Sequence, residues 1–297
     1  MRNVKNILMI AVIGSTLFAS TGRVAALGGN PVFWNDYTAM YSFPHMLNNQ
    51  NAAWTDAFSN VNAVWGETTK WGFGFDNENA HDVMNMYWGN GTMGAMFGLN
   101  LDNSGTDMAF GVDFGFGMPV EGVGDLGVTG GYADELDFGV NFAMPLNAWL
   151  FTDMVTSFNT SNTFSDMAFK ADFYSMNEGD NGGAGVFAMG ISSGGCTWCD
   201  DQAIGSDFSM NWTFGMETTM TDWATFRLGY TKSYDLMSQT GNPGMPTVGF
   251  GFDYGSFMLD MVVSTTTAAN MMNNPVHYFW GKNTDALGSG FSISYIW

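Results

Sequence analysis

Acidic side chains recur at alternate positions in several long amphipathic stretches of the chain. Between residues 106 and 118, Asp107 and Asp113 share one register with Ala and Gly, while Phe110, Phe114 and Phe116 occupy the other. Extending this assignment places nine acids and two basic residues on the small-residue face: Asp107, Asp113, Asp137, Asp166, Asp172, Asp207, Glu217, Asp253 and Asp260, with Lys170 and Arg227. A wall with this excess of carboxylates would attract cations.

The elements that carry these acids are expected to be β-strands, because alternation with a period of two places successive side chains on opposite faces of a strand. The same alternation returns at 136–144 and 204–217. The stretches run for about eleven to fourteen residues, a length that suits tilted membrane strands and exceeds the usual globular strand. The sequence therefore predicts an all-β, antiparallel, up-and-down transmembrane β-barrel. A soluble β-sandwich is the alternative, since it also alternates.

We expect about fourteen strands, an even number as bacterial single-chain barrels have. They cover residues 60–67, 71–76, 83–89, 92–101, 106–118, 134–145, 147–158, 164–176, 182–192, 203–217, 223–236, 245–254, 256–267 and 287–297. Residues 124–132 could form a further strand.

The connections support this arrangement, because such barrels have short periplasmic turns and longer external loops. If the last strand ends in the periplasm, the external connections are the long ones at 268–286, 237–244, 193–202 and 119–133. The periplasmic connections are then the shorter ones at 255, 218–222, 146 and 102–105.

The overall composition fits a barrel with one lipid face and one wet face. Aromatic residues make up 16% of the chain, glycine 39 of 297 residues, and charged residues only 12%, where a soluble domain carries about a quarter. The formal net charge of −20 argues against nucleic acid as a partner, because phosphate binding needs basic residues. The expected partners are outer-membrane lipid and small solutes or cations; the oligomeric state stays open.

The N-terminus is typical of a signal peptide. Arg2 and Lys5 precede an apolar run over 7–18, and small residues follow from Ala19. Residues 24–26 fit an A-x-A-like cleavage site, although cleavage after Ala19 or Gly22 is also chemically reasonable. We expect a signal peptide over 1–26, an N-terminal segment over 27–59 and the barrel over 60–297, located in the bacterial outer membrane.

The C-terminus ends in an alternating aromatic register. Its outward residues are expected to be Phe291, Ile293, Tyr295 and Trp297. This pattern resembles the C-terminal β-signal of bacterial outer-membrane proteins, which implies recognition by the barrel-assembly machinery. That family usually ends in Phe, so Trp297 is a departure.

Residues 27–59 lack clean alternation and are rich in aromatic and amide side chains. They could fill the lumen as a plug, or form a periplasmic tail. Fourteen strands preceded by such a segment are similar in architecture to the FadL-type transporters, although no diagnostic motif accompanies the likeness.

Other reactive residues point to little chemistry. Cys196 and Cys199 lie on an expected external loop, where a loop-closing disulfide is favoured and a redox pair is the alternative. No second cysteine pair completes a zinc site. The three histidines, His45, His81 and His277, accompany no nucleophile motif, so we expect neither an enzyme nor a cofactor or metal.

These observations predict a porin-like channel for passive diffusion of small, preferentially cationic solutes. FadL-type uptake of hydrophobic molecules is the second possibility, and a structural or adhesive surface barrel is the third. An open acidic lumen favours diffusion, whereas a sealed lumen with an apolar pocket favours uptake of hydrophobic molecules.

Overall fold

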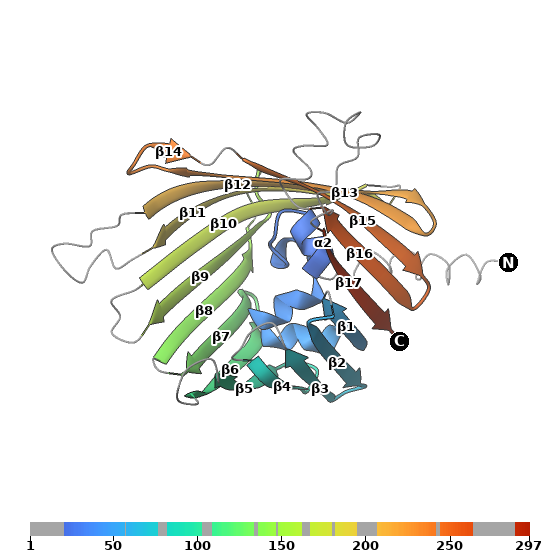
Figure 1. Cartoon of the computed structure of the whole chain (residues 1–297). Helices are drawn as coiled ribbons and strands as arrows, with labels where there is room; N and C mark the ends of the chain where they lie inside the picture. Colours follow the sequence, from blue (N-terminus) through green and yellow to red (C-terminus); the bar gives the residue numbers. More distant parts are fainter. Residues whose placement is uncertain are drawn as a thin grey trace.

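The chain folds into a single closed β-barrel (Figure 1). The computed structural model describes residues 21–56, 58–76, 82–102, 109–133, 136–146, 148–161, 167–179, 182–194, 207–241, 244–263 and 289–297. Within these residues one antiparallel sheet of seventeen strands closes through pairing of β1 with β17. The two-residue β14 lies on the edge of β13, which pairs directly with β15, so the described barrel wall has sixteen strands.

The strands follow one another in chain order around the wall. Their bounds are β1 (Ala52–Asp56), β2 (Asn60–Gly66), β3 (Lys70–Asp76), β4 (Asp82–Gly89), β5 (Gly94–Asp102), β6 (Ala109–Val120), β7 (Gly124–Tyr132), β8 (Leu136–Pro145), β9 (Asp153–Ser161), β10 (Met167–Glu178), β11 (Ala184–Gly194), β12 (Asp207–Thr221), β13 (Ala224–Asp235), β14 (Thr240–Gly241), β15 (Met245–Tyr254), β16 (Phe257–Val263) and β17 (Ser289–Ile296).

The period-two alternation forms these strands as expected. In β6, Phe110, Phe114 and Phe116 are exposed on the outside, while Gly115 and Gly117 are buried on the inside. The same division holds along β12, where Phe214 is exposed and Glu217 is buried. The barrel wall therefore has an apolar outer face and an inner face of small or polar residues.

The prediction of fourteen strands is wrong by two. The first additional strand, β1, falls inside the expected N-terminal segment; with only five residues it is too short to show alternation. The second, β7, covers residues 124–132 and contains four glycines in nine residues, which weaken its apolar register. Inserting β7 reverses the side of every earlier connection. The β5–β6 connection, expected in the periplasm at 102–105, therefore lies at the same end as the β16–β17 connection.

The short turns and the C-terminus lie at one end of the barrel, which we call the periplasmic end after the orientation expected from the sequence. The β6–β7, β12–β13 and β15–β16 strands join there through two or three residues, at 121–123, 222–223 and 255–256. Gly122 and Gly255 have φ of 73° and 75°, a left-handed conformation that favours glycine in such tight turns.

Short helices occupy the inside of the barrel (Figure 1). They are α2 (Thr21–Ala26), η1 (Val32–Trp34), η2 (Tyr37–Tyr41) and η3 (Pro44–Asn49). The helix α2 contacts β13, β15, β16 and β17, and η3 contacts β4, β5 and β6 on the other side. We call residues 21–50 the plug. None of the helices in the described ranges is both long and apolar enough to cross a bilayer.

The hydrophobic core lies between the plug and the inner wall. In one cluster, plug residues such as Phe33 and Trp34 pack against Tyr174 and Val186 of the wall. In the other, Tyr37, Met40 and Leu47 of the plug pack against the wall residues Trp54, Val64 and Tyr87. Because each cluster draws on both partners, the plug is an integral part of the folded protein.

Candidate functional site

Glycines line the inner wall where the plug backbone comes closest. A Cβ atom at Gly215 would lie 2.6 Å from the Leu27 carbonyl oxygen and 2.6 Å from Cζ2 of Trp34. A Cβ atom at Gly229 would lie 2.6 Å from the Ala26 carbonyl oxygen. The opposite wall repeats this arrangement around residues 42–45 at Gly94, Gly117 and Gly127. The glycines therefore accommodate the plug, because only a residue without a side chain permits such contact.

Four buried charged side chains join the plug to the wall; we call them the ion chain. Arg23 of α2 donates from Nε to Oε2 of Glu217 at 2.9 Å and from Nη2 to Oε1 at 2.5 Å. Arg227 donates from Nε to the same Oε2 at 3.2 Å and from Nη1 to Oδ1 of Asp260. All four side chains are 5% exposed or less. Their charges cancel, which is the condition for burying ions at acceptable cost.

Arg23 is held in its charged form. Burial alone would lower the pKa of Arg23, but the neighbouring Glu217 carboxylate more than compensates, and the pKa is raised. The guanidinium carbon also lies 5.7 Å from the ring centroid of Trp34, within cation–π distance. Arg23 therefore links α2 both to the barrel wall and to the rest of the plug.

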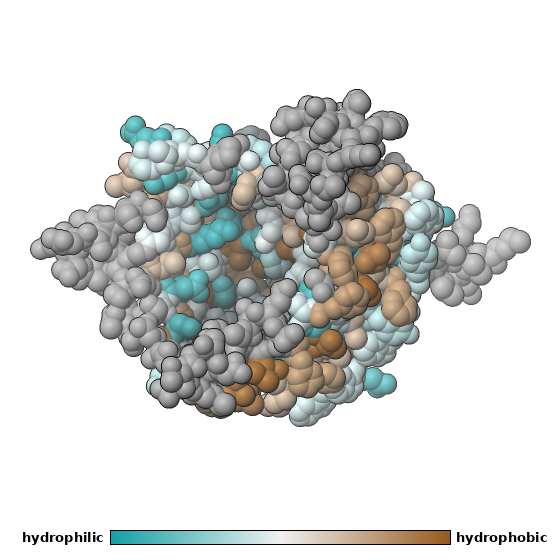
Figure 2. Space-filling model, in the orientation of Figure 1, coloured by the Kyte–Doolittle hydropathy of each residue, from teal (hydrophilic) through white to brown (hydrophobic). Residues whose placement is uncertain are grey.

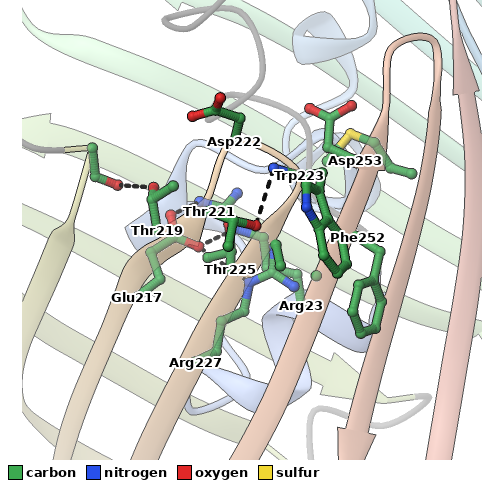
Figure 3. Close-up of a pocket in the computed structure, with 14 residues that line it drawn as sticks. Arg23, Glu217, Thr219, Thr221, Asp222, Trp223, Thr225, Arg227, Phe252 and Asp253 are labelled. Carbon is green, nitrogen blue, oxygen red and sulfur yellow. Dashed lines mark hydrogen bonds and ion pairs between the residues drawn. The ribbon is translucent and has the colours of Figure 1, made fainter.

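A cavity of about 310 Å³ lies beside the ion chain, next to the β12–β13 and β15–β16 turns. Figure 3 shows the guanidinium groups of Arg23 and Arg227 directed at Glu217, and Trp223 beside Phe252. The rings of Trp223 and Phe252 stack with centroids 6.0 Å apart. The ion chain thus borders a space near the periplasmic end that combines charged and aromatic lining.

The plug contains a second buried ionisable group, Asp36. Its Oδ1 accepts hydrogen bonds from the backbone N–H of Thr38 at 2.8 Å and from Oγ1 of Thr38 at 2.6 Å, and so caps η2. The residue is 1% exposed, and among the described residues its Oδ2 has no hydrogen-bond partner. Burial raises the pKa of Asp36 to about 7, although Arg23 opposes the shift. Asp36 therefore titrates near neutral pH.

The structure divides the acids expected in the lumen into paired and open groups. Glu217 and Asp260 belong to the ion chain with Arg227, which was also expected inside. Asp172 pairs with Lys170 at 2.8 Å. Asp113 accepts a hydrogen bond from Nδ2 of Asn100 at 2.6 Å.

Three of these acids border open space, and the hydrogen-bonded Asp113 is one of them. Asp113 and Asp137 both line a cavity of about 240 Å³ beside Tyr41 of the plug. Asp253 lines the cavity near the periplasmic turns. In Figure 2 the hollow at the centre left shows hydrophilic patches next to hydrophobic ones. Of the six expected lumen acids whose side chains the structure describes, three are therefore paired with basic side chains and three border open space.

Several of the predicted lumen and disulfide residues lie outside the part of the chain that the structure describes. Asp107, Asp166, Cys196 and Cys199 lie outside the described residues, as does the side chain of Asp207. Within the described ranges, no three His, Cys, Asp or Glu side chains gather as metal ligands would.

The outer surface of the barrel carries exposed aromatic and aliphatic side chains around its circumference. Examples are Trp71, Phe97, Phe138, Phe187 and Tyr230. Figure 2 shows this hydrophobic surface along the strands at the right. A closed barrel with an apolar exterior satisfies all its backbone groups within the sheet and can face lipid. The chain therefore has the fold and the apolar exterior of a transmembrane β-barrel. Its location in an outer membrane stays a prediction.

The four residues of the expected C-terminal signal lie where this barrel requires them. Phe291, Ile293 and Tyr295 occupy the outward register of β17, while Ser292 and Ser294 are buried inside. The Trp297 ring stacks on Tyr295 with centroids 5.8 Å apart. Recognition of this segment by the assembly machinery stays a prediction.

Comparison with known proteins gives only remote similarities. No family model matches the sequence, and no curated protein matches it. Among solved structures, CdiB from Acinetobacter baumannii is similar at 9% identity and a TM-score of 0.39, over 84% of this chain and 59% of CdiB. The translocator domain of the autotransporter NalP from Neisseria meningitidis has 9% identity and a TM-score of 0.26, over 84% of this chain and 85% of that domain. The chain thus spans less than two thirds of CdiB.

Sequence reasoning missed the residues of the plug that matter most. Arg23 was assigned to the signal peptide, and Asp36 was not considered. The available signal was modest: Arg23 is a lone basic residue among small and apolar neighbours, and Asp36 precedes Thr38 at N-cap spacing. The residues that surround Arg23 and Asp36 in the fold are remote in sequence. The pattern of neighbouring residues therefore could not show that Arg23 pairs with the wall or that Asp36 is buried.

The fit of the plug can be tested by substituting a glycine beneath it. Gly215→Val should lower the stability of the folded barrel by about 1–3 kcal/mol, because overpacking forces the plug away from the wall. Gly185→Val is the matched control, since a Cβ atom there would meet its nearest neighbour at 3.8 Å, an ordinary contact. Thermal unfolding in detergent, followed by circular dichroism, measures both. Equal stability of the two variants would contradict the close fit.

Proposed function

We propose that this barrel is a transport pore closed at rest by its own plug, and that it admits small solutes when the plug moves. No catalytic step is part of the proposal. It replaces the expected open channel for passive diffusion, because an open channel needs a continuous water path through the lumen.

One observation carries the proposal: residues 21–50 are packed inside the barrel and joined to opposite walls. On one side α2 contacts β13 and β15–β17, and on the other η3 contacts β4–β6. Barrels of this strand number enclose a wide lumen, and a segment that fills it controls passage. The plug is joined to the wall by charge and by close contact, so its release has a defined cost.

Cation preference is a finer part of the proposal. Once the plug moves, Asp113 and Asp137 remain beside open space, and their field would favour cations. The preference is expected to be modest, since Glu217, Asp260 and Asp172 are each paired with a basic side chain.

FadL-type uptake of hydrophobic molecules is the second candidate. It is favoured by the apolar packing of the plug and by the aromatic and methionine lining of the cavity near the periplasmic turns, where Trp223, Phe252 and Met258 lie. Saturable binding of a fatty acid or similar amphiphile to the purified barrel would favour this candidate over passage of hydrophilic solutes.

Planar-bilayer recording tests the proposal directly. The wild-type protein should show little steady current, with brief openings when the plug moves. A large steady current would indicate an open porin. Absence of current both in the wild type and in variants with a destabilised plug would indicate a structural or adhesive barrel instead.

The expected selectivity has its own test in a variant that holds the pore open. Adding Asp113→Asn and Asp137→Asn to such a variant should move the reversal potential under a KCl gradient toward zero. The effect should fade at high salt, because the Debye length falls from about 10 Å at 0.1 M to about 3 Å at 1 M. Lys232→Gln is the control: Lys232 lies on the outward register of β13 and is exposed. Equal shifts from both changes would refute the assignment of faces.

A further inference from the structure

We infer that Thr21–Ala26 belongs to the mature protein, and that any leader is removed upstream of Thr21, between Ala19 and Ser20. This inference deepens the proposed function, because α2 carries the residue that joins the plug to the barrel wall. It replaces the cleavage after Ala26 that the A-x-A-like pattern favours.

The first argument is the fit of α2 against the wall. The backbone N–H of Gly22 donates to Oγ of Ser292 in β17 at 3.1 Å. A Cβ atom at Gly22 would lie 2.8 Å from that Oγ and 3.0 Å from the Asp260 carbonyl oxygen. The helix is thus seated against two strands through a glycine, and Ala26 is fully buried at its other end.

The second argument is charge balance in the ion chain. A mature chain that began at Leu27 would lack Arg23. Glu217 would then lose the two hydrogen bonds that Arg23 donates and keep the one from Arg227. Glu217 is 5% exposed and Asp260 is 1% exposed. Removing one partner from a buried ion network leaves an uncompensated charge, which is strongly unfavourable. The wall acids therefore require Arg23 as their fourth member.

Cleavage after Gly22 is disfavoured for a related reason. It would place a new α-ammonium group on Arg23, whose side chain is 1% exposed, and would add a second positive charge at a buried position. It would also remove the Gly22 hydrogen bond to Ser292. Ala19 is the nearest upstream residue at which the sequence analysis allowed cleavage, since signal peptidase requires small residues there.

The decisive experiment is intact-mass and N-terminal peptide analysis of the protein isolated from outer membranes. We expect a mature chain that begins at Ser20. A chain that begins at Arg23 or at Leu27 would overturn the inference. The measured mass does not depend on conductance. A barrel that never conducts would therefore refute the proposed function, whereas the inferred mature N-terminus would still stand.

A second experiment tests the role of Arg23 with leaders fused directly to Ser20 or to Leu27. The Leu27 chain should unfold in detergent about tenfold faster or more than the Ser20 chain, because its ion chain is incomplete. Glu217→Gln should slow unfolding of the Leu27 chain by removing the unpaired charge, and should speed unfolding of the Ser20 chain by leaving Arg23 unbalanced. Equal unfolding rates for the two unmodified chains would overturn the inference.

Discussion

A chain carrying Arg23→Glu is expected to conduct ions steadily in planar bilayers, whereas the wild type stays closed for most of a recording. The substitution places three carboxylates around Arg227, and two of them, Glu217 and Asp260, are already within its hydrogen-bonding reach. Breaking a buried ion pair costs about 3–5 kcal/mol. Since each 1.4 kcal/mol is about a factor of ten in an equilibrium constant, the population of the displaced plug should rise by a factor of roughly 10² to 4 × 10³.

Two variants make this result specific to the ion chain. Arg23→Lys keeps a positive charge opposite Glu217 and should leave the barrel in its closed state. Lys170→Gln removes another lumen cation that pairs with an acid, but its side chain is 46% exposed, so it should leave the current unchanged. The idea fails if Lys170→Gln opens the pore as much as Arg23→Glu does.

The plug is expected to be less stable at pH 8 than at pH 5 because of Asp36. Its pKa is about 7 in the folded protein, against an ordinary value of 3.8. A carboxyl with a raised folded pKa opposes ionisation, so its contribution to stability is complete below pH 4 and is lost as the pH rises from about 4 to about 7. The loss between pH 5 and pH 7 corresponds to about 3 kcal/mol, because each pH unit in this range contributes about 1.4 kcal/mol.

Hydrogen exchange of residues 32–41, corrected for the intrinsic pH dependence of exchange, measures this change. Asp36→Asn provides the control, because the amide keeps a carbonyl oxygen for Thr38 but cannot ionise. The variant should show the same plug protection at pH 5 and at pH 8. A wild-type plug equally protected at both pH values would contradict the assignment, as would an Asn variant that keeps the wild-type dependence.

Much of the barrel could be predicted from residue order alone, because the relevant interactions are local. A strand's outward and inward faces are encoded by alternation, so the outward positions of Phe110, Phe114 and Phe291 followed directly from the sequence. The ends of these stretches predicted short turns at 218–222 and 255, and the structure places them at 222–223 and 255–256. The same pattern missed β1, which is too short to alternate, and indicated β7 only as a possible further strand, because repeated glycine weakens its apolar register.

The packing of the plug inside the lumen was decided by the tertiary structure. An inward glycine such as Gly215 has the same place in the alternation whether it faces water or the backbone of Leu27, and only the fold distinguishes the two. Likewise, Glu217 and Asp260 were expected to line a pore, yet their charges are cancelled by Arg227 and by Arg23, which lies 194 residues from Glu217 in sequence. Alternation is a property of neighbouring residues, whereas charge compensation depends on which distant groups meet. The sequence therefore determined the wall of this barrel, and the three-dimensional contacts determined what fills it.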